Sequence, residues 1–242
     1  MASASSAERI VGVLEACAAS AESVPLADLV RATGLPKTSV HRLCRKLCGL
    51  GMLDHGPGGY QLGARLYALA GSPAIHTLRA RAIPVLHELA MTSGFNANLA
   101  VLSGSQALLV EEVYDRAWPT RMVGQSLPLH CSAAGKALLL GRSARQIEQL
   151  VGPGPLVPQT RHSIVHTELL IAQLAAAESD GVVYSNEEWR LGISAVAAPV
   201  ADAQRSGVAI SLAGPPGTRV LRSLAEPVRR AARSLALALS EG

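Results

Sequence analysis

The segment LADLVRATGLPKTSVHRLCRKLCGLGML, residues 26–53, constrains the fold most, because two short helical patterns in it are separated by a turn. In the second pattern Leu35, Val40, Leu43, Leu47 and Leu50 recur with the period of an amphipathic helix. The ten residues from 37 to 46 hold four Lys/Arg and one His but no carboxylate. TGLPK, between the two patterns, has the length and the glycine of a helix-turn-helix connection. The segment therefore predicts a small helical unit with positive charge on one side.

The flanking residues complete this unit. Residues 8–19 place apolar side chains at i, i+3, i+4 and i+7, which predicts an amphipathic helix with Ser5 or Ser6 as its N-cap. After the basic segment, MLDHGPGGYQLG carries two short apolar-bearing stretches around a glycine-rich turn, as a β-hairpin does. We therefore expect a winged helix-turn-helix over residues 1–71.

A helix with uncompensated cations on one face suits double-stranded DNA, because the major groove accepts an α-helix between two phosphate ridges. A solvated helix face is the ordinary alternative for a charge run, but the missing carboxylates, the preceding turn and the following hairpin favour DNA. We expect base-edge or phosphate contacts from Thr38, Ser39 and Arg42, and phosphate contacts from Lys37, Arg45 and Lys46. His41 lies on the same outer face and completes the predicted DNA-binding set.

The remainder of the chain predicts a linker helix over 72–92, with a kink or break at Pro84, and a second domain over 93–242. In this second domain short strands alternate with helices. NANLAVLSG and ALLVEEVYD read as a hairpin, and the last helix is expected to be interrupted near Pro227. The predicted class is α+β.

Composition sets further limits. With 242 residues, 49% of them hydrophobic and 17% charged, the chain is expected to fold into two units. Aromatic residues make up only 3%, which disfavours a single-strand nucleic-acid binder that stacks bases. The four cysteines form no disulfide framework, and neither a secretory leader nor an 18-residue apolar run is evident, so we expect a cytoplasmic protein that does not contact membranes. Cys44 and Cys48 are expected in the core, with redox pairing of Cys44 and Cys17 left open.

Three pairs of residues carry chemistry that would suit an enzyme or a metal site: His130 and Cys131, His162 and His166, Glu187 and Glu188. Neighbours on a strand point to opposite faces, which separates the first pair. The second pair lacks a third ligand, and consecutive carboxylates diverge, so that one of them is expected to pair with an Arg or to cap a turn. We therefore expect no catalytic residue, no metal and no cofactor.

Several separated stretches resemble one protein family in order and spacing. ADLVRATGLPKTSVHRL followed by YQLGARLYALA is similar to the winged helix-turn-helix of the IclR-type family of bacterial transcriptional regulators. LPLHCSAAGKALL, GVVYSNEEWRLGISAVAAPV and AISLAGP resemble the effector-binding domain of that family. The resemblance implies a GAF/PAS-like domain with a curved antiparallel sheet, and a DNA-bound homodimer or dimer of dimers. Such proteins mostly repress transcription, some activate it, and many respond to small organic acids or aromatic catabolites.

The resemblance also implies an effector pocket formed by Leu127, Ala133, Ala134, Ser185, Ile193, Ala195, Ser211 and Ala213. Independently, exposed backbone N–H groups at the start of the SAAGKALLL helix would suit a carboxylate, and Ser211 could add a hydroxyl donor. Where relatives that bind small keto acids tend to present an Asp, a Cys and two Ser, this chain has Ser185, Ala195, Ser211 and Ala213. The pocket is thus expected to be less polar, and its effector larger or more apolar than glyoxylate or pyruvate, unless the pocket is vestigial.

The sequence therefore predicts a DNA-binding transcriptional regulator, expected to be a repressor, whose operator affinity changes when a small organic acid or a more apolar metabolite binds. The alternative is a small-molecule-binding protein or an enzyme without specific DNA binding. Steep salt dependence of DNA binding would distinguish the two.

Overall fold

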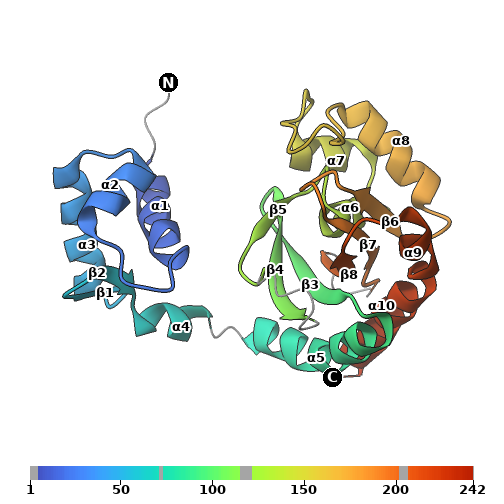
Figure 1. Ribbon diagram of the computed structural model, residues 1–242, viewed down its shortest axis with the longest axis horizontal. Coiled ribbons are helices and arrows are strands. Elements are labelled where there is room, and N and C mark those ends of the chain that lie inside the picture. The colour runs from blue at the N-terminus through green and yellow to red at the C-terminus, as the bar shows by residue number, and fades with distance from the viewer. Residues whose placement is uncertain (1–4, 71–72, 115–121, 202–206, 242) are drawn as a thin grey trace. The chain divides into compact units, whose positions relative to one another are not determined.

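The computed structural model describes residues 5–70, 73–114, 122–201 and 207–241, except for the side chains of 218–220. It divides into two compact units, Met1–His76 and Thr77–Gly242 (Figure 1). The boundary between the units along the chain falls inside helix α5. Leu78 and Leu86 of this helix pack into the core of the second unit. The separate linker over 72–92 stays a prediction.

The first unit contains the predicted helices and hairpin, α1 (Ser6–Ala18), α2 (Leu26–Thr33), α3 (Lys37–Gly49), β1 (Leu53–Gly56) and β2 (Gly59–Leu62). A further short helix, α4 (Ala64–Ala70), was not predicted from the sequence. Ser5 is the N-cap of α1, and it exchanges hydrogen bonds with Glu8 in a capping box. Gly34, at φ 65°, ends α2 in the left-handed conformation that glycine adopts without strain. Buried residues from all three leading helices and the hairpin form one core: Val13, Cys17, Val24, Leu29, Val40, Cys44, Leu47, Leu53 and Tyr60.

The hairpin β1–β2 is held against the segment before α2. Val24 and Tyr60 exchange both backbone hydrogen bonds, at 2.7 and 2.9 Å, and form an isolated β-bridge beside the wing. Gly59 allows this approach, because a Cβ at that position would lie 2.3 Å from the Val24 carbonyl oxygen. The wing is therefore anchored to the helical part of the unit.

The second unit is a six-stranded antiparallel sheet in the order β5-β4-β3-β8-β7-β6, with helices on both faces (Figure 1). Its strands are β3 (Asn96–Ser103), β4 (Gln106–Val113), β5 (Ser126–Pro128), β6 (Val183–Asn186), β7 (Ser194–Pro199) and β8 (Val208–Gly214). Its helices are α5 (Pro73–Ser93), α6 (Ala133–Leu139), α7 (Ala144–Val151), α8 (Thr167–Ala177), α9 (Thr218–Ser223) and α10 (Ala225–Ser240). The predicted α+β class is confirmed.

The two faces of this sheet bury different residues, because successive side chains along a strand alternate. Ile210 and Leu212 pack with α5 and α10, whereas Ala209 and Ala197 pack with α6 and α8. The second face carries smaller side chains. That face holds the cavity described below.

Pro84 lies inside α5, and Pro227 lies inside α10. Of the kink or break predicted at Pro84, the break is wrong, because α5 continues through this residue. Buried residues on both sides, Leu78 and Leu86 among them, attach both halves to the sheet. The kink stays a prediction. The interruption predicted near Pro227 is confirmed, but it falls at Leu224, between α9 and α10. Pro227 lies in the first turn of α10, where its missing N–H costs no helical hydrogen bond.

Candidate nucleic-acid interface and ligand cavity

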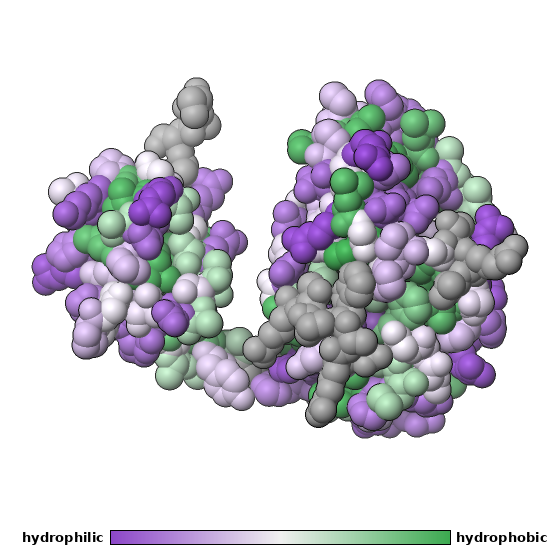
Figure 2. All heavy atoms as spheres, viewed as in Figure 1, coloured by the Kyte–Doolittle hydropathy of each residue, from purple (hydrophilic) through white to green (hydrophobic). Residues whose placement is uncertain are grey.

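Helix α3 separates its side chains as the sequence predicts. Its buried face consists of Val40, Cys44 and Leu47, with Leu43 half-buried. Six of the seven predicted DNA-contacting residues are exposed and Ser39 is half-buried; the exposed ones are Lys37, Thr38, His41, Arg42, Arg45 and Lys46. Strongly hydrophilic residues cover much of the visible surface of the first unit (Figure 2).

The cations of α3 are not neutralised within their own unit. Among the described residues, Lys37, Arg42, Arg45 and Lys46 form no ion pair, and the first turn of α3 holds no acidic residue. On the neighbouring helix α2, by contrast, Arg31 contacts Asp28 at 2.9 Å. The positive face of α3 therefore remains available to an external polyanion such as DNA.

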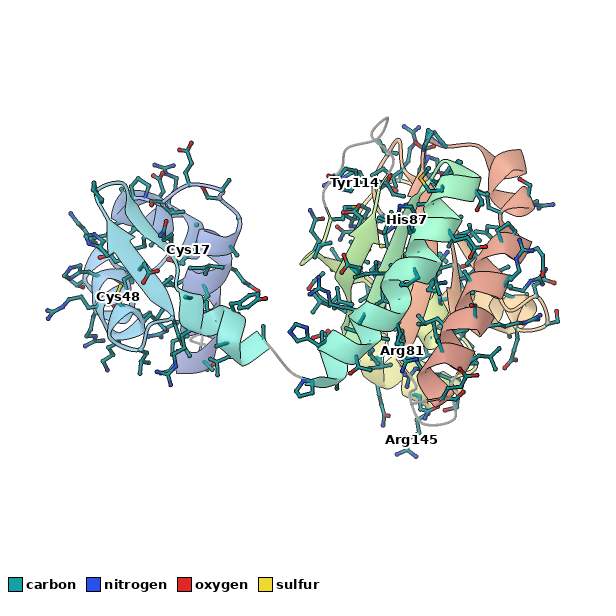
Figure 3. All side chains as sticks on the ribbon, turned by 90° about the horizontal axis from the view of Figure 1, so that it is seen from below. Cys17, Cys48, Arg81, His87, Tyr114 and Arg145 are labelled. Carbon is teal, nitrogen blue, oxygen red and sulfur yellow. The ribbon has the colours of Figure 1, made fainter. Side chains whose placement is uncertain are left out.

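The cysteines of the first unit are core residues rather than reactive thiols. Cys17 and Cys44 are buried. The positions of Cys17 and Cys48 are labelled in Figure 3. Burial raises the pKa of the Cys44 thiol to about 11 and also raises the pKa of Cys17. Both thiols stay protonated at neutral pH, which disfavours the redox pairing left open above.

The second unit encloses a small cavity of about 30 Å³ between the smaller-residue face of the sheet and α6. All eight residues of the predicted effector set line it: Leu127, Ala133, Ala134, Ser185, Ile193, Ala195, Ser211 and Ala213. The described lining leaves this space too narrow for a ligand with an aromatic ring. Trp189, which is half-buried, forms part of the cavity wall.

Sequence reasoning missed five lining residues: Asn98, Leu109, Met122, Ser132 and Trp189. Asn98 and Leu109 come from β3 and β4, whose inward-facing positions follow from the register of the sheet and not from a local motif. Trp189 directly follows Glu187 and Glu188, which the sequence indicated only as possible acid–base residues. The described lining contains no charged side chain.

The predicted anion site at the start of α6 is weaker than expected. The helix has only seven residues, and Ser132 already accepts the Gly135 N–H at 3.0 Å. Ser132 also donates to the Pro128 carbonyl oxygen at 2.7 Å, and a Cβ on Gly135 would lie 2.6 Å from the same oxygen. This tight turn brings Ala133 and Ala134 to the cavity. It also uses one backbone N–H group at the start of the helix, that of Gly135, which is then not free to bind a ligand.

A buried ion pair lies beside the cavity. Lys136 of α6 donates to both carboxylate oxygens of Glu188, at 2.7 and 2.9 Å, and to Gln173 Oε1 at 3.0 Å. Burial lowers the pKa of Lys136 and raises the pKa of Glu188, and their mutual attraction opposes both shifts. Of the two roles expected for these carboxylates, an Arg pair or a turn cap, the structure shows the cap: Glu187 accepts the Gly192 N–H at 2.7 Å, while Glu188 pairs with a Lys.

The remaining candidate pairs make no reactive site. His130 and Cys131 lie in the turn between β5 and α6, not on a strand. Burial raises the pKa of Cys131 to about 12 and lowers the pKa of His130, so neither is charged at neutral pH. His162 lies in a turn and His166 is the N-cap of α8, so they do not share a helix face. Within the described ranges, no three His, Cys, Asp or Glu residues cluster as a metal site would, and no helix is long and apolar enough to cross a bilayer.

Both parts of the chain match domains of one known protein family. Residues 74–241 match the C-terminal domain of the bacterial transcriptional regulator IclR, and residues 6–57 match the IclR helix-turn-helix domain. The chain belongs to the IclR family. It is therefore a DNA-binding transcriptional regulator and not an enzyme.

Relatives within the IclR family cover most of the chain. The probable transcriptional regulator SauR of Cupriavidus necator is 33% identical over 200 residues, which cover 80% of this chain and 79% of the relative. The transcriptional repressor IclR of Escherichia coli is 32% identical, over 84% of this chain and 77% of the relative. An IclR homologue from Microbacterium hydrocarbonoxydans, solved in complex with 4-hydroxybenzoate, is 26% identical with a TM-score of 0.80, over 97% of this chain and 98% of that one.

Proposed function

We propose that this IclR-family regulator binds its operator through α3 as a homodimer or dimer of dimers, represses transcription, and changes its operator affinity when a small molecule occupies the cavity beside α6. Contacts come from Lys37, Thr38, Ser39, His41, Arg42, Arg45 and Lys46. The single observation that carries the DNA contact is the exposed, unpaired cationic face of α3 within the described residues. Repression is supported by the similarity to the E. coli relative, which is a transcriptional repressor. A protein that acts on chromosomal DNA works in the cytoplasm.

The proposed effector is a small organic acid or a more apolar metabolite held by Leu127, Ala133, Ala134, Ser185, Ile193, Ala195, Ser211 and Ala213. These residues lie around one cavity, and a structural relative was solved with an aromatic acid bound. Because the enclosed volume is small, binding requires the wall to move. That movement is the event that we propose to couple to DNA affinity.

Dimer formation is supported by helix α4, which has no buried residue in its own unit. Tyr67 is 81% exposed and Leu69 is 59% exposed, so a second copy of the chain would shield apolar surface there. Two copies also suit an operator with two half-sites.

The test is binding of the full chain to labelled DNA from the region upstream of its own gene, against a shuffled fragment of equal length. Specific binding that weakens steeply with salt supports the proposal. Equal affinity for both fragments would favour the alternative, a small-molecule-binding protein without specific DNA binding.

A further inference from the structure

Two polar residues face each other across the floor of the cavity. Asn98 of β3 and Ser211 of β8 are direct partners in the antiparallel register, so their side chains lie on the same face of the sheet. Both line the cavity, and their exposed fractions are only 1% and 4%. They are therefore shielded from bulk water at the place where a ligand would rest.

The contacts of Asn98 set which end of its amide faces the cavity. Its Nδ2 donates to the Asn96 carbonyl oxygen at 3.2 Å, and a carbonyl can only accept. The amide nitrogen must therefore lie on that side. Its Oδ1 is buried and has no hydrogen-bond partner among the described residues. An acceptor is thus left unsatisfied in the wall of the cavity, which is an unfavourable arrangement unless something supplies a donor.

The other cavity serines cannot serve in the same way. Ser185 donates to the Cys131 carbonyl oxygen at 2.8 Å, and Ser132 is used in the turn before α6. The Ser211 hydroxyl makes no hydrogen bond within the part of the chain that the structure describes, so it can both donate and accept. The described lining carries no cation that would compensate an anion.

We propose that Asn98, with Ser211 beside it, is the specificity-determining pair of the cavity, and that it selects an effector whose sheet-facing end is a neutral hydrogen-bond donor on an apolar body, such as a phenolic hydroxyl. This inference rests on the proposed effector role of the cavity. An ionised carboxylate has no donor and is disfavoured at this end, because its oxygens would face Asn98 Oδ1. An apolar group of equal size would leave the amide oxygen unpaired.

Three probes of similar shape separate these cases: phenol, toluene and benzoate. At about pH 7.5 phenol is neutral and benzoate is ionised. The full chain carries two tryptophans, so a Trp118→Phe background leaves Trp189, in the cavity wall, as the single tryptophan, whose emission can be excited selectively. We expect phenol to bind at least about tenfold more tightly than toluene and benzoate, which is about 1.4 kcal/mol.

The matched variant is Asn98→Leu, which keeps the size of the side chain and removes the acceptor. It should weaken phenol binding by about tenfold and leave toluene binding unchanged. Its resistance to urea should be equal to or greater than that of the unmodified chain, because the variant no longer buries an unpaired oxygen. Ser211→Ala should lower phenol binding by a smaller factor. If Asn98→Leu does not fold, the three-probe comparison in the Trp118→Phe background still decides.

Three results would overturn the inference: benzoate or toluene binding as tightly as phenol, an unchanged preference in Asn98→Leu, or no binding of any probe at about 10 mM. Operator binding is measured separately. Loss of specific DNA binding would contradict the proposed function without altering the phenol-to-toluene ratio, whereas a wrong ratio with intact operator binding overturns this inference alone.

Discussion

Lys136 Nζ lies 2.7 Å from Glu188 Oε1, with the Lys side chain fully buried and the Glu side chain 10% exposed. The pair joins α6, which lines the cavity, to the turn before Trp189. Ser163 strengthens the same turn, because its hydroxyl donates to the Glu188 carbonyl oxygen at 2.6 Å. The ion pair therefore links the turn that carries Trp189 to α6.

The first prediction concerns this ion pair. Lys136→Met leaves the Glu188 carboxyl buried without its partner, and should lower the free energy of unfolding by about 3–5 kcal/mol. Combining it with Glu188→Leu should restore most of that loss, because the double variant buries no charge. Urea unfolding of both single variants and the double variant measures the coupling. Strictly additive losses would show that the two residues do not interact.

The second prediction is a loss of stability in mild acid that depends on His130. This buried ring has a pKa below its ordinary value of 6.5, chiefly because burial disfavours the charged form. Unfolded chains bind a proton there more readily, so the His130 contribution is present above pH 6.5 and is lost as the pH falls through the lowered pKa of the folded state. His130→Gln should reduce the difference in unfolding free energy between about pH 7.5 and about pH 5.5. A pH profile of His130→Gln identical to that of the unmodified chain would contradict the assignment.

The third prediction concerns access to the cavity. Ala134→Trp places a large ring in a space of about 30 Å³, and should abolish ligand binding and the response of operator affinity to phenol while DNA binding persists. Ala176→Trp, on the exposed side of α8, is the control and should respond as the unmodified chain does. Calorimetry with phenol and a DNA shift assay measure the two effects. An unchanged response in Ala134→Trp would exclude this cavity as the effector site.

The fourth prediction tests dimerisation through α4. Replacing Tyr67 and Leu69 by Glu puts two like charges on the exposed apolar surface and should raise the dimer dissociation constant by at least about tenfold. Light scattering over a concentration series measures it. Since Leu237 is exposed on α10 in the other unit, Leu237→Glu serves as a control. Equal dimer fractions in both variants would place the interface elsewhere.

The first unit was predicted well from local sequence patterns, because its caps, turns and helix faces are determined by residues that lie close together in the sequence. The Ser5 cap, the Gly34 stop and the exposed cations of α3 all follow from spacing within one turn or helix. The cavity is different, because Asn98 and Ser211 are brought together by strand pairing over 113 positions of sequence. Likewise the Lys136–Glu188 pair joins residues 52 apart, so neither residue suggested the other. Only the lining residues implied by the resemblance to the family were predicted from the sequence.

The central claim is that α3 inserts its cationic face between the phosphates of the operator, and the measurement that tests it most directly is the salt dependence of operator affinity for Arg42→Ala. Loss of one phosphate or base contact should weaken specific binding by about 1–3 kcal/mol and, for a phosphate contact, reduce the slope of log K against log salt by about 1. Arg145→Ala removes the same charge from a side chain that projects from the second unit (Figure 3), and should leave both quantities unchanged. Equal affinity and equal slope for Arg42→Ala and the unmodified chain would contradict the account.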